Sequence, residues 1–165
     1  MSKEKIFGAA RHSPRGEWVQ TTIVNQVAGI LFRRSNVIEY CDAVRKADRK
    51  GLVYTVKLRP EPTQTHGPNA IAIYGLVRIK SFFGTKSVVK WHIGYVGREL
   101  ANELQEDLLS KGIPIAAELY DINQSGQFID INYLVLAPPG HGLRRRVEDR
   151  QYQQWYLDTQ IWPIH

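Results

Sequence analysis

The sequence predicts a small α+β protein that is mainly β, built as an OB-like antiparallel barrel with two helices. Its 165 residues suit one domain, and a hydrophobic content of 43% is enough for a buried core. Segments that favour β-structure outnumber those with helical spacing. Parallel βαβ wrapping would need more helices than the chain offers, so an antiparallel barrel is expected.

The N-terminal third begins with residues 1–16, which mix Lys, Arg, Gly, Ser and Pro without periodicity and are expected to be a flexible basic arm. Residues 17–32 are rich in β-favouring side chains and predict a strand region with a bend near Gly29. Helical spacing follows in Val37, Ile38, Cys41 and Val44. Gly51 is a typical helix end, and Cys41 on the apolar face is expected to be a buried thiol.

The rest of the barrel domain, predicted to span residues 17–137, consists mostly of strands. The expected strands are 52–58, 70–77, 88–96, 114–122 and 128–136. Residues 60–69 contain three prolines and a glycine and predict a loop, while Phe82-Phe83-Gly84 resembles a hairpin tip. The spacing of Leu100, Leu104 and Leu108 predicts a helix over 97–111. Residues 138–165 are expected to be an aromatic and basic C-terminal extension.

The charge is unevenly distributed along the chain. The formal net charge is +6, and residues 1–96 hold 16 Lys/Arg against 6 Asp/Glu, whereas residues 97–140 hold 2 against 7. A basic first half and an acidic second half indicate one positive face, whose commonest partner is a polyanion such as nucleic acid. The other interpretation of the high pI is that it only aids solubility.

The sequence contains no motif that indicates an enzyme. GxSxG, HExxH, Walker and CxxC patterns are absent, and the five histidines show no pair at metal-ligand spacing. Glu99, Glu103 and Glu106 on the second helix are interpreted as a solvated face. We therefore expect no catalytic residues, no metal and no cofactor. A single cysteine and the lack of a long apolar run or signal peptide predict a cytoplasmic or nucleoid-associated protein.

Three short segments occur in a characteristic order: VAGILFR at 27–33, PEPTQTHGPNAIAIY at 60–74 and IGYVGRELANEL at 93–104. Together they resemble the HIRAN domain, a small module that is fused to helicase-like DNA-remodelling ATPases and also occurs alone in bacteria and phages. The resemblance covers about residues 24–122. No ATPase motor is present, so the chain resembles a stand-alone or accessory form.

The resemblance implies a modified oligonucleotide-binding barrel that grips the 3′ end of single-stranded DNA. In such a site bases stack on aromatic side chains and basic side chains hold the phosphates. It assigns stacking to Phe32 and His66. Arg98, at the start of the helix predicted over 97–111, is expected to hold a phosphate together with the helix N-terminus. The implied nucleic-acid-binding residues are Phe32, Arg33, Arg34, Arg59, Gln64, Thr65, His66, Tyr95 and Arg98. Lys57 and the lysines near Phe83 would add to electrostatic capture.

Two positions depart from the family pattern. Leu31 stands where the family usually has an arginine, so Arg33 and Arg34 would have to take over that role. Gly67 stands where the family normally has an aspartate that accepts a hydrogen bond from the terminal 3′-hydroxyl. Asn69 is expected to brace the loop backbone. The scaffold is therefore expected to be kept, while recognition of a free 3′ end is not.

The leading hypothesis is a non-enzymatic module that binds single-stranded DNA or DNA ends and works with a helicase, a nuclease or another DNA-processing protein. The sequence does not separate DNA from RNA. A second hypothesis is a protein-interaction adaptor or inhibitor that uses the barrel as a scaffold, and a third is a nuclease whose site is assembled only in space.

The C-terminal extension lies outside the resemblance and carries the interface candidates of the second hypothesis. They are Tyr152, Trp155, Tyr156 and Trp162. Glu148 and Asp149 follow Arg144 and Arg145 at i+4, which predicts a short helix to about Leu157. Large aromatic side chains at a terminus are typical interface anchors, so we expect packing over the barrel, self-association or partner binding.

Overall fold

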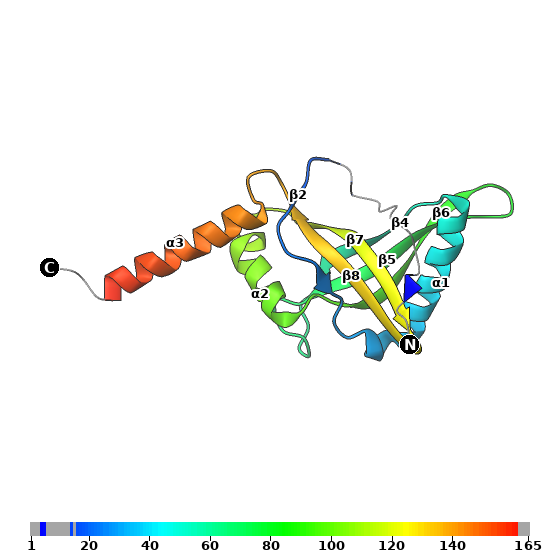
Figure 1. Ribbon diagram of the computed structural model, residues 1–165, viewed down its shortest axis with the longest axis horizontal. Helices are drawn as coiled ribbons and strands as arrows, with labels where there is room; N and C mark the ends of the chain where they lie inside the picture. The colour runs from blue at the N-terminus through cyan, green and yellow to red at the C-terminus, as the bar shows by residue number, and fades with distance from the viewer. Residues whose placement is uncertain (1–3, 6–13, 15, 162–165) are drawn as a thin grey trace.

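The computed structural model describes residues 4–5, 14 and 16–161. Its strands are β1 (Glu4–Lys5), β2 (Val19–Gln20), β3 (Asn25–Gln26), β4 (Tyr54–Pro60), β5 (Ile71–Lys80), β6 (Lys86–Tyr95), β7 (Ala116–Ser125) and β8 (Phe128–Ala137). Its helices are α1 (Arg34–Lys50), α2 (Arg98–Asp107) and α3 (Leu143–Ile161), with 3₁₀ helices η1 (Ile30–Arg33) and η2 (Leu109–Lys111). The predicted class, mainly β and α+β with antiparallel strands, is confirmed (Figure 1).

Two antiparallel sheets enclose the core. One has the order β1-β7-β8-β2, with β3 also paired to β8, and the other has the order β4-β5-β6. They meet at a bridge between Ala28 and Tyr95, where each N–H donates to the other's carbonyl oxygen at 2.9 Å. Between β4 and β7, in contrast, the described residues form no ladder of backbone hydrogen bonds. The predicted OB-like barrel is therefore not closed by hydrogen bonds on this side.

Helix α1 covers the inner side of the β5–β6 hairpin. Tyr40 is fully buried there and donates a hydrogen bond from its hydroxyl to the carbonyl oxygen of Thr55 at 2.8 Å. A Cβ on Gly75 would lie 2.5 Å from the Tyr40 ring, so only glycine allows the helix this close. Cys41 is buried as predicted, and burial raises the pKa of its thiol to about 12.

The N-terminal region differs from its prediction. Residues 17–32 form only the short strands β2 and β3 and the helix η1, because Thr21 and Thr22 are buried and bond to their surroundings instead of extending a strand. In the predicted arm, β1 pairs with β7, and residues 1–3, 6–13 and 15 lie outside the described residues.

A third helix, α3, projects from the body beside α2 (Figure 1). Its anchor is Arg146, which is only 6% exposed and forms ion pairs with Glu103 at 2.9 Å and Asp107 at 2.7 Å. Arg150 also pairs with Asp107, at 2.7 Å. Of the residues interpreted as a solvated face of α2, Glu99 and Glu106 are exposed as expected, whereas Glu103 is half-buried and is paired with Arg146. No helix in the part of the chain that the structure describes is long and apolar enough to cross a membrane.

Candidate nucleic-acid interface

A cavity of about 160 Å³ opens where η1, the 60–69 loop, β6 and the start of α2 meet. We call it the end cavity. Four of the residues singled out from the sequence line it: Phe32, His66, Tyr95 and Arg98. They come from four separate segments of the chain, and the fold brings them to one place.

Backbone geometry explains how η1 comes to lie over β6. The bridge from Ala28 to Tyr95 fixes the segment before η1 against the end of the strand. A Cβ on Gly94 would collide with the carbonyl oxygen of Ala28, so the glycine of the IGYV segment permits this approach. Gly29 then adopts φ 78°, a left-handed conformation that starts the 3₁₀ turn and turns Phe32 outward.

Four rings form a continuous row that we call the aromatic cluster: His66, Tyr95, His92 and Tyr74. His66 stacks on Tyr95 with ring centroids 4.0 Å apart, and Tyr95 meets His92 edge-on at 4.9 Å. His92 in turn stacks on Tyr74 at 4.8 Å. Rings at these separations gain from the geometry of their π systems in addition to burial.

Cationic side chains lie on this row. The guanidinium of Arg33 is 5.5 Å from the centre of the Tyr95 ring, and it donates to the Tyr95 hydroxyl at 3.4 Å. The ammonium of Lys90 lies 5.2 Å from the centre of the Tyr74 ring. Glu61 is the acidic neighbour, accepting a hydrogen bond from the Tyr74 hydroxyl at 2.7 Å. The cluster thus combines π faces with positive charge, as single-strand binders do.

Phe32 and Arg98 occupy the rim of the end cavity. Phe32 is 92% exposed, so its ring is not part of the core and offers a free π face. Arg98 is exposed in the first turn of α2, whose N-cap Gly97 has no side chain to satisfy the first backbone N–H groups. An anion at this position would meet both a guanidinium and the positive end of the helix.

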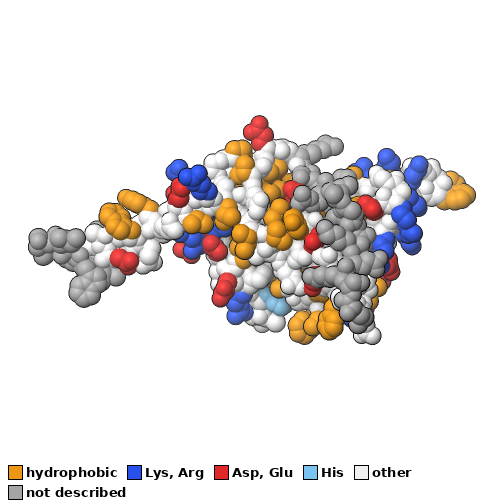
Figure 2. Space-filling view, in the orientation of Figure 1, with side chains coloured by type: hydrophobic (Ala, Val, Ile, Leu, Met, Phe, Trp, Pro, Cys, Tyr) orange, Lys and Arg blue, Asp and Glu red, His pale blue; other side chains and the backbone are white. Residues whose placement is uncertain are grey.

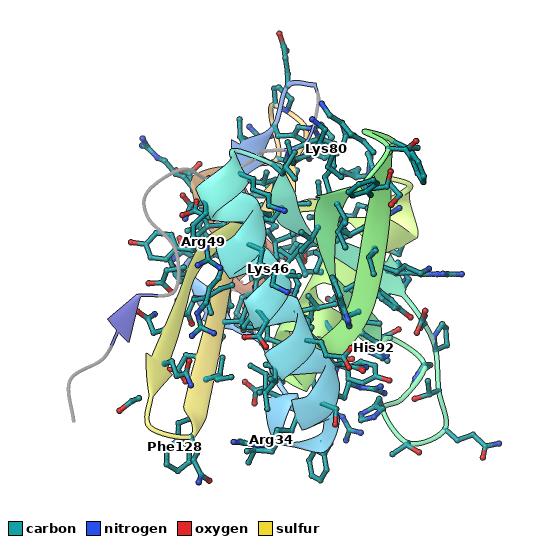
Figure 3. The ribbon with its side chains drawn as sticks, turned by 90° about the vertical axis from the view of Figure 1, so that its right-hand side faces the viewer. Arg34, Lys46, Arg49, Lys80, His92 and Phe128 are labelled. Carbon is teal, nitrogen blue, oxygen red and sulfur yellow. The ribbon has the colours of Figure 1, made fainter. Side chains whose placement is uncertain are left out.

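Other predicted residues lie elsewhere. Arg34 donates to the carbonyl oxygen of Gln127 at 2.9 Å and so lies against the β7–β8 turn, near Phe128 in Figure 3. Arg59 forms an ion pair with Glu61 at 3.5 Å. Gln64 and Thr65 are exposed at the end of the 60–69 loop and are not among the residues that line the end cavity.

The 60–69 loop is closed by a small turn. Thr63 and Gly67 exchange backbone hydrogen bonds at 3.1 and 2.8 Å, and the Thr63 hydroxyl accepts one from the His66 N–H at 2.8 Å. Gly67 has φ 94°, which favours glycine there. Asn69 does not brace its own loop as expected but donates to Asn102 of α2 at 3.1 Å, because the loop packs against that helix.

His92 and Tyr74 were missed in the sequence. The signal that could have found them is the alternation of side chains along β5 and β6. In the hairpin that these strands form, Tyr74 lies opposite His92. A bulge beside this pair, between Ile73 and Tyr74, hides the register. Burial, followed by the nearby charge of Arg33, lowers the pKa of His92, whose Nε2 lies 3.0 Å from the Gly94 carbonyl oxygen.

The interface candidates Tyr152, Trp155 and Tyr156 are exposed on the outer half of α3, and Trp162 lies outside the described residues. The helix runs to Ile161 rather than to about Leu157, and the expected i,i+4 pairs Arg144–Glu148 and Arg145–Asp149 are present.

Within the described residues, no three His, Cys, Asp or Glu side chains gather as a metal site. Comparison with protein-family models, with curated proteins and with solved structures found no match for this chain.

Proposed function

We propose that this protein binds single-stranded DNA or DNA ends without catalysing a reaction, through the end cavity and the aromatic cluster beside it. The observation that carries the proposal is the convergence of Phe32, His66, Tyr95 and Arg98 on one cavity. The resemblance of three sequence segments to the HIRAN domain supports the same function.

Stacking supplies the first part of the mechanism. A nucleobase entering the end cavity meets the exposed ring of Phe32 and the stacked pair of His66 and Tyr95. Any base has a π face, so this contact tolerates different sequences and contributes about 1–3 kcal/mol per base. A cavity of about 160 Å³ suits the end of a strand rather than a duplex.

Phosphate binding supplies the second part. Arg98 lines the cavity at the start of α2, and Arg33 lies over the ring of Tyr95, which also lines it. Between residues 51 and 98 the sequence holds seven Lys/Arg and one acid, Glu61. A backbone that leaves the cavity along the outer face of β4–β6 would therefore stay in a positive field.

The test is an anisotropy titration of a labelled single-stranded oligonucleotide with wild type, Phe32→Ala and Leu31→Ala. Leu31 is the neighbouring residue and is 71% exposed, but it has no π face, which makes it the matched control. Phe32→Ala is expected to weaken binding by about 1–3 kcal/mol and Leu31→Ala to leave it unchanged. Equal affinities of all three proteins, each folded, would contradict the proposal.

A specific observation also favours the second candidate, a protein-interaction role for α3. Arg146 and Arg150 hold the first half of this helix on α2, while Tyr152, Trp155 and Tyr156 stay exposed on the second half. An aromatic surface on a fixed helix is a typical partner anchor. Light scattering of wild type beside Trp155→Ser tests self-association, and an unchanged monomeric mass for both would exclude a homo-oligomer through this face.

A further inference from the structure

The hairpin that joins β5 to β6 carries two of the three most exposed aromatic side chains among the described residues. Phe82 is 99% and Phe83 is 90% exposed, and the two rings meet edge-to-face with centroids 5.5 Å apart. The hairpin extends beyond α1 at the end of the molecule opposite α3 (Figure 1), where Figure 2 shows apolar side chains with Lys and Arg next to them. Neither the core nor the end cavity uses these rings.

The tip is a defined turn. The Ser81 N–H donates to the Thr85 carbonyl oxygen at 2.7 Å, and the Ser81 hydroxyl accepts from the Thr85 N–H at 3.1 Å. Gly84 closes the turn with φ 83° and donates to the Ser81 carbonyl oxygen at 2.9 Å. The Phe82–Phe83 pair is therefore presented on a fixed support.

The base of the hairpin is positively charged. Lys80 and Lys86 are direct cross-strand partners, and with Lys50 of α1 they line a shallow hollow of about 670 Å³ that also includes Phe82. No acidic residue lines this hollow, and β5 and β6 contain none. The hairpin thus combines the rings of Phe82 and Phe83 with three nearby ammonium groups. A nucleic acid matches both features, because its bases are flat and apolar and its backbone is negatively charged.

The hairpin continues the proposed interface. Side chains alternate along β6, so Lys86, Val88, Lys90 and His92 share the outer face of the sheet. Lys90 lies over Tyr74, which confirms that this face belongs to the aromatic cluster. His92 lies six positions along the strand from Lys86, a span of about 20 Å. Figure 3 shows Lys80 and His92 towards opposite ends of the hairpin.

We propose that this hairpin is a second nucleic-acid contact, at which Phe82 and Phe83 insert as a wedge at the last base pair of a duplex and unstack it, while its single-stranded end runs along β6 to the end cavity. The inference rests on the proposed function and adds the kind of substrate: a junction between double and single strand. Phenylalanine wedges are known to insert at base steps and unstack them, and lysines at their base hold the phosphates.

The experiment uses two labelled DNAs, a duplex with a 3′ overhang and the overhang sequence alone, with the full-length protein. The variant is Phe82→Ser with Phe83→Ser, and the control is Ile23→Ser, an exposed apolar residue on the segment between β2 and β3. The double variant is expected to bind the junction roughly five- to hundredfold more weakly than wild type does. The double variant should bind the single strand as tightly as wild type does. Ile23→Ser should bind both the junction and the single strand as tightly as wild type does.

A second reading comes from 2-aminopurine at the terminal base pair. Its fluorescence should rise when wild type binds the junction and stay constant with the double variant, because only the wedge unstacks the pair. Substituting Phe82→Trp and Phe83→Trp should restore both the affinity and the fluorescence change.

Each other outcome has a definite meaning. If the double variant binds the junction as wild type does, or loses the single strand equally, the duplex contact is overturned while the proposed function stands. If wild type binds neither DNA, both proposals fail. Sedimentation with phosphatidylserine/phosphatidylcholine vesicles that depends on the Phe pair, with unchanged junction binding, would assign the hairpin to a membrane surface and overturn the inference.

Discussion

The ring of His66 stacks on that of Tyr95, with centroids 4.0 Å apart and an interplanar angle of 27°. The first residue belongs to the 60–69 loop and the second to the end of β6, so this contact fixes the loop over the strand. It also creates a single stacked surface at the end cavity. A base would bind beside a preorganised pair instead of ordering two separate side chains.

His66→Ala is expected to weaken single-strand binding by about 1–3 kcal/mol, because it removes one ring of this surface. His66 is exposed, so the loss of its ring contact with Tyr95 should lower the melting temperature only slightly. Titration with oligonucleotide beside a thermal melt gives both values. Thr65→Ala, in the same loop but outside the cavity, is the control, and an equal loss of affinity in it would contradict the stacking role.

Recognition of a free 3′ end is expected to be poor. A hydroxyl–carboxylate hydrogen bond contributes about 1.5–3 kcal/mol, which is tenfold or more in affinity, and Gly67 has no side chain to supply it. Oligonucleotides with free and phosphate-blocked 3′ ends should therefore differ by less than this when titrated in parallel. A strong preference for the free end would show that another group reads the hydroxyl.

The pKa of His92 is lowered, mainly by burial and then by Arg33, and this predicts a pH effect on stability. A histidine whose folded pKa lies below its unfolded value of about 6.5 stabilises the fold above that value. This contribution is lost as the pH falls through the lowered pKa. Urea denaturation from pH 7.5 downward should show that wild type loses more stability than His92→Gln. Parallel pH profiles for the two proteins would refute the assignment.

Arg146→Ala is expected to lower the free energy of unfolding by about 1.5–3 kcal/mol, because it removes charge-assisted hydrogen bonds to Glu103 and Asp107 and leaves the largely buried Asp107 with Arg150 alone. The Arg146 guanidinium also donates to the Thr21 carbonyl oxygen at 2.7 Å, which would lose this donor. The control is Arg144→Ala, whose exposed pair with Glu148 should contribute less than about 1 kcal/mol. Similar denaturation midpoints for both variants would show that α3 is not anchored through Arg146.

Helices and turns that depend on the spacing of nearby residues could be predicted from the sequence. The helix predicted over 97–111 is present as α2 and the 3₁₀ turn η2 after it, and Gly51 ends α1 with φ 66°. The secondary structure of residues 17–32 could not be predicted from such spacing. Their β-propensity is overridden by tertiary bonds, such as the one that the Val135 N–H donates to the Thr22 hydroxyl.

The candidate site was predictable only in part, because it depends on register and helix phase. Arg33 and Arg34 are neighbours in the sequence, yet Arg33 contacts Tyr95 and Arg34 bonds to Gln127. The chain enters α1 at this point, and successive side chains of a helix turn by about 100°. The pairing of Tyr74 with His92 likewise depends on a bulge that no local pattern reveals.

The central claim, that a single strand of nucleic acid binds this face through its phosphates and bases, is tested most directly by a titration of labelled single-stranded DNA over a range of salt concentrations. If three or four phosphates contact the basic side chains, the slope of log affinity against log salt should be roughly −2 to −3. Binding that is absent at low salt, or that does not change with salt, would contradict the account.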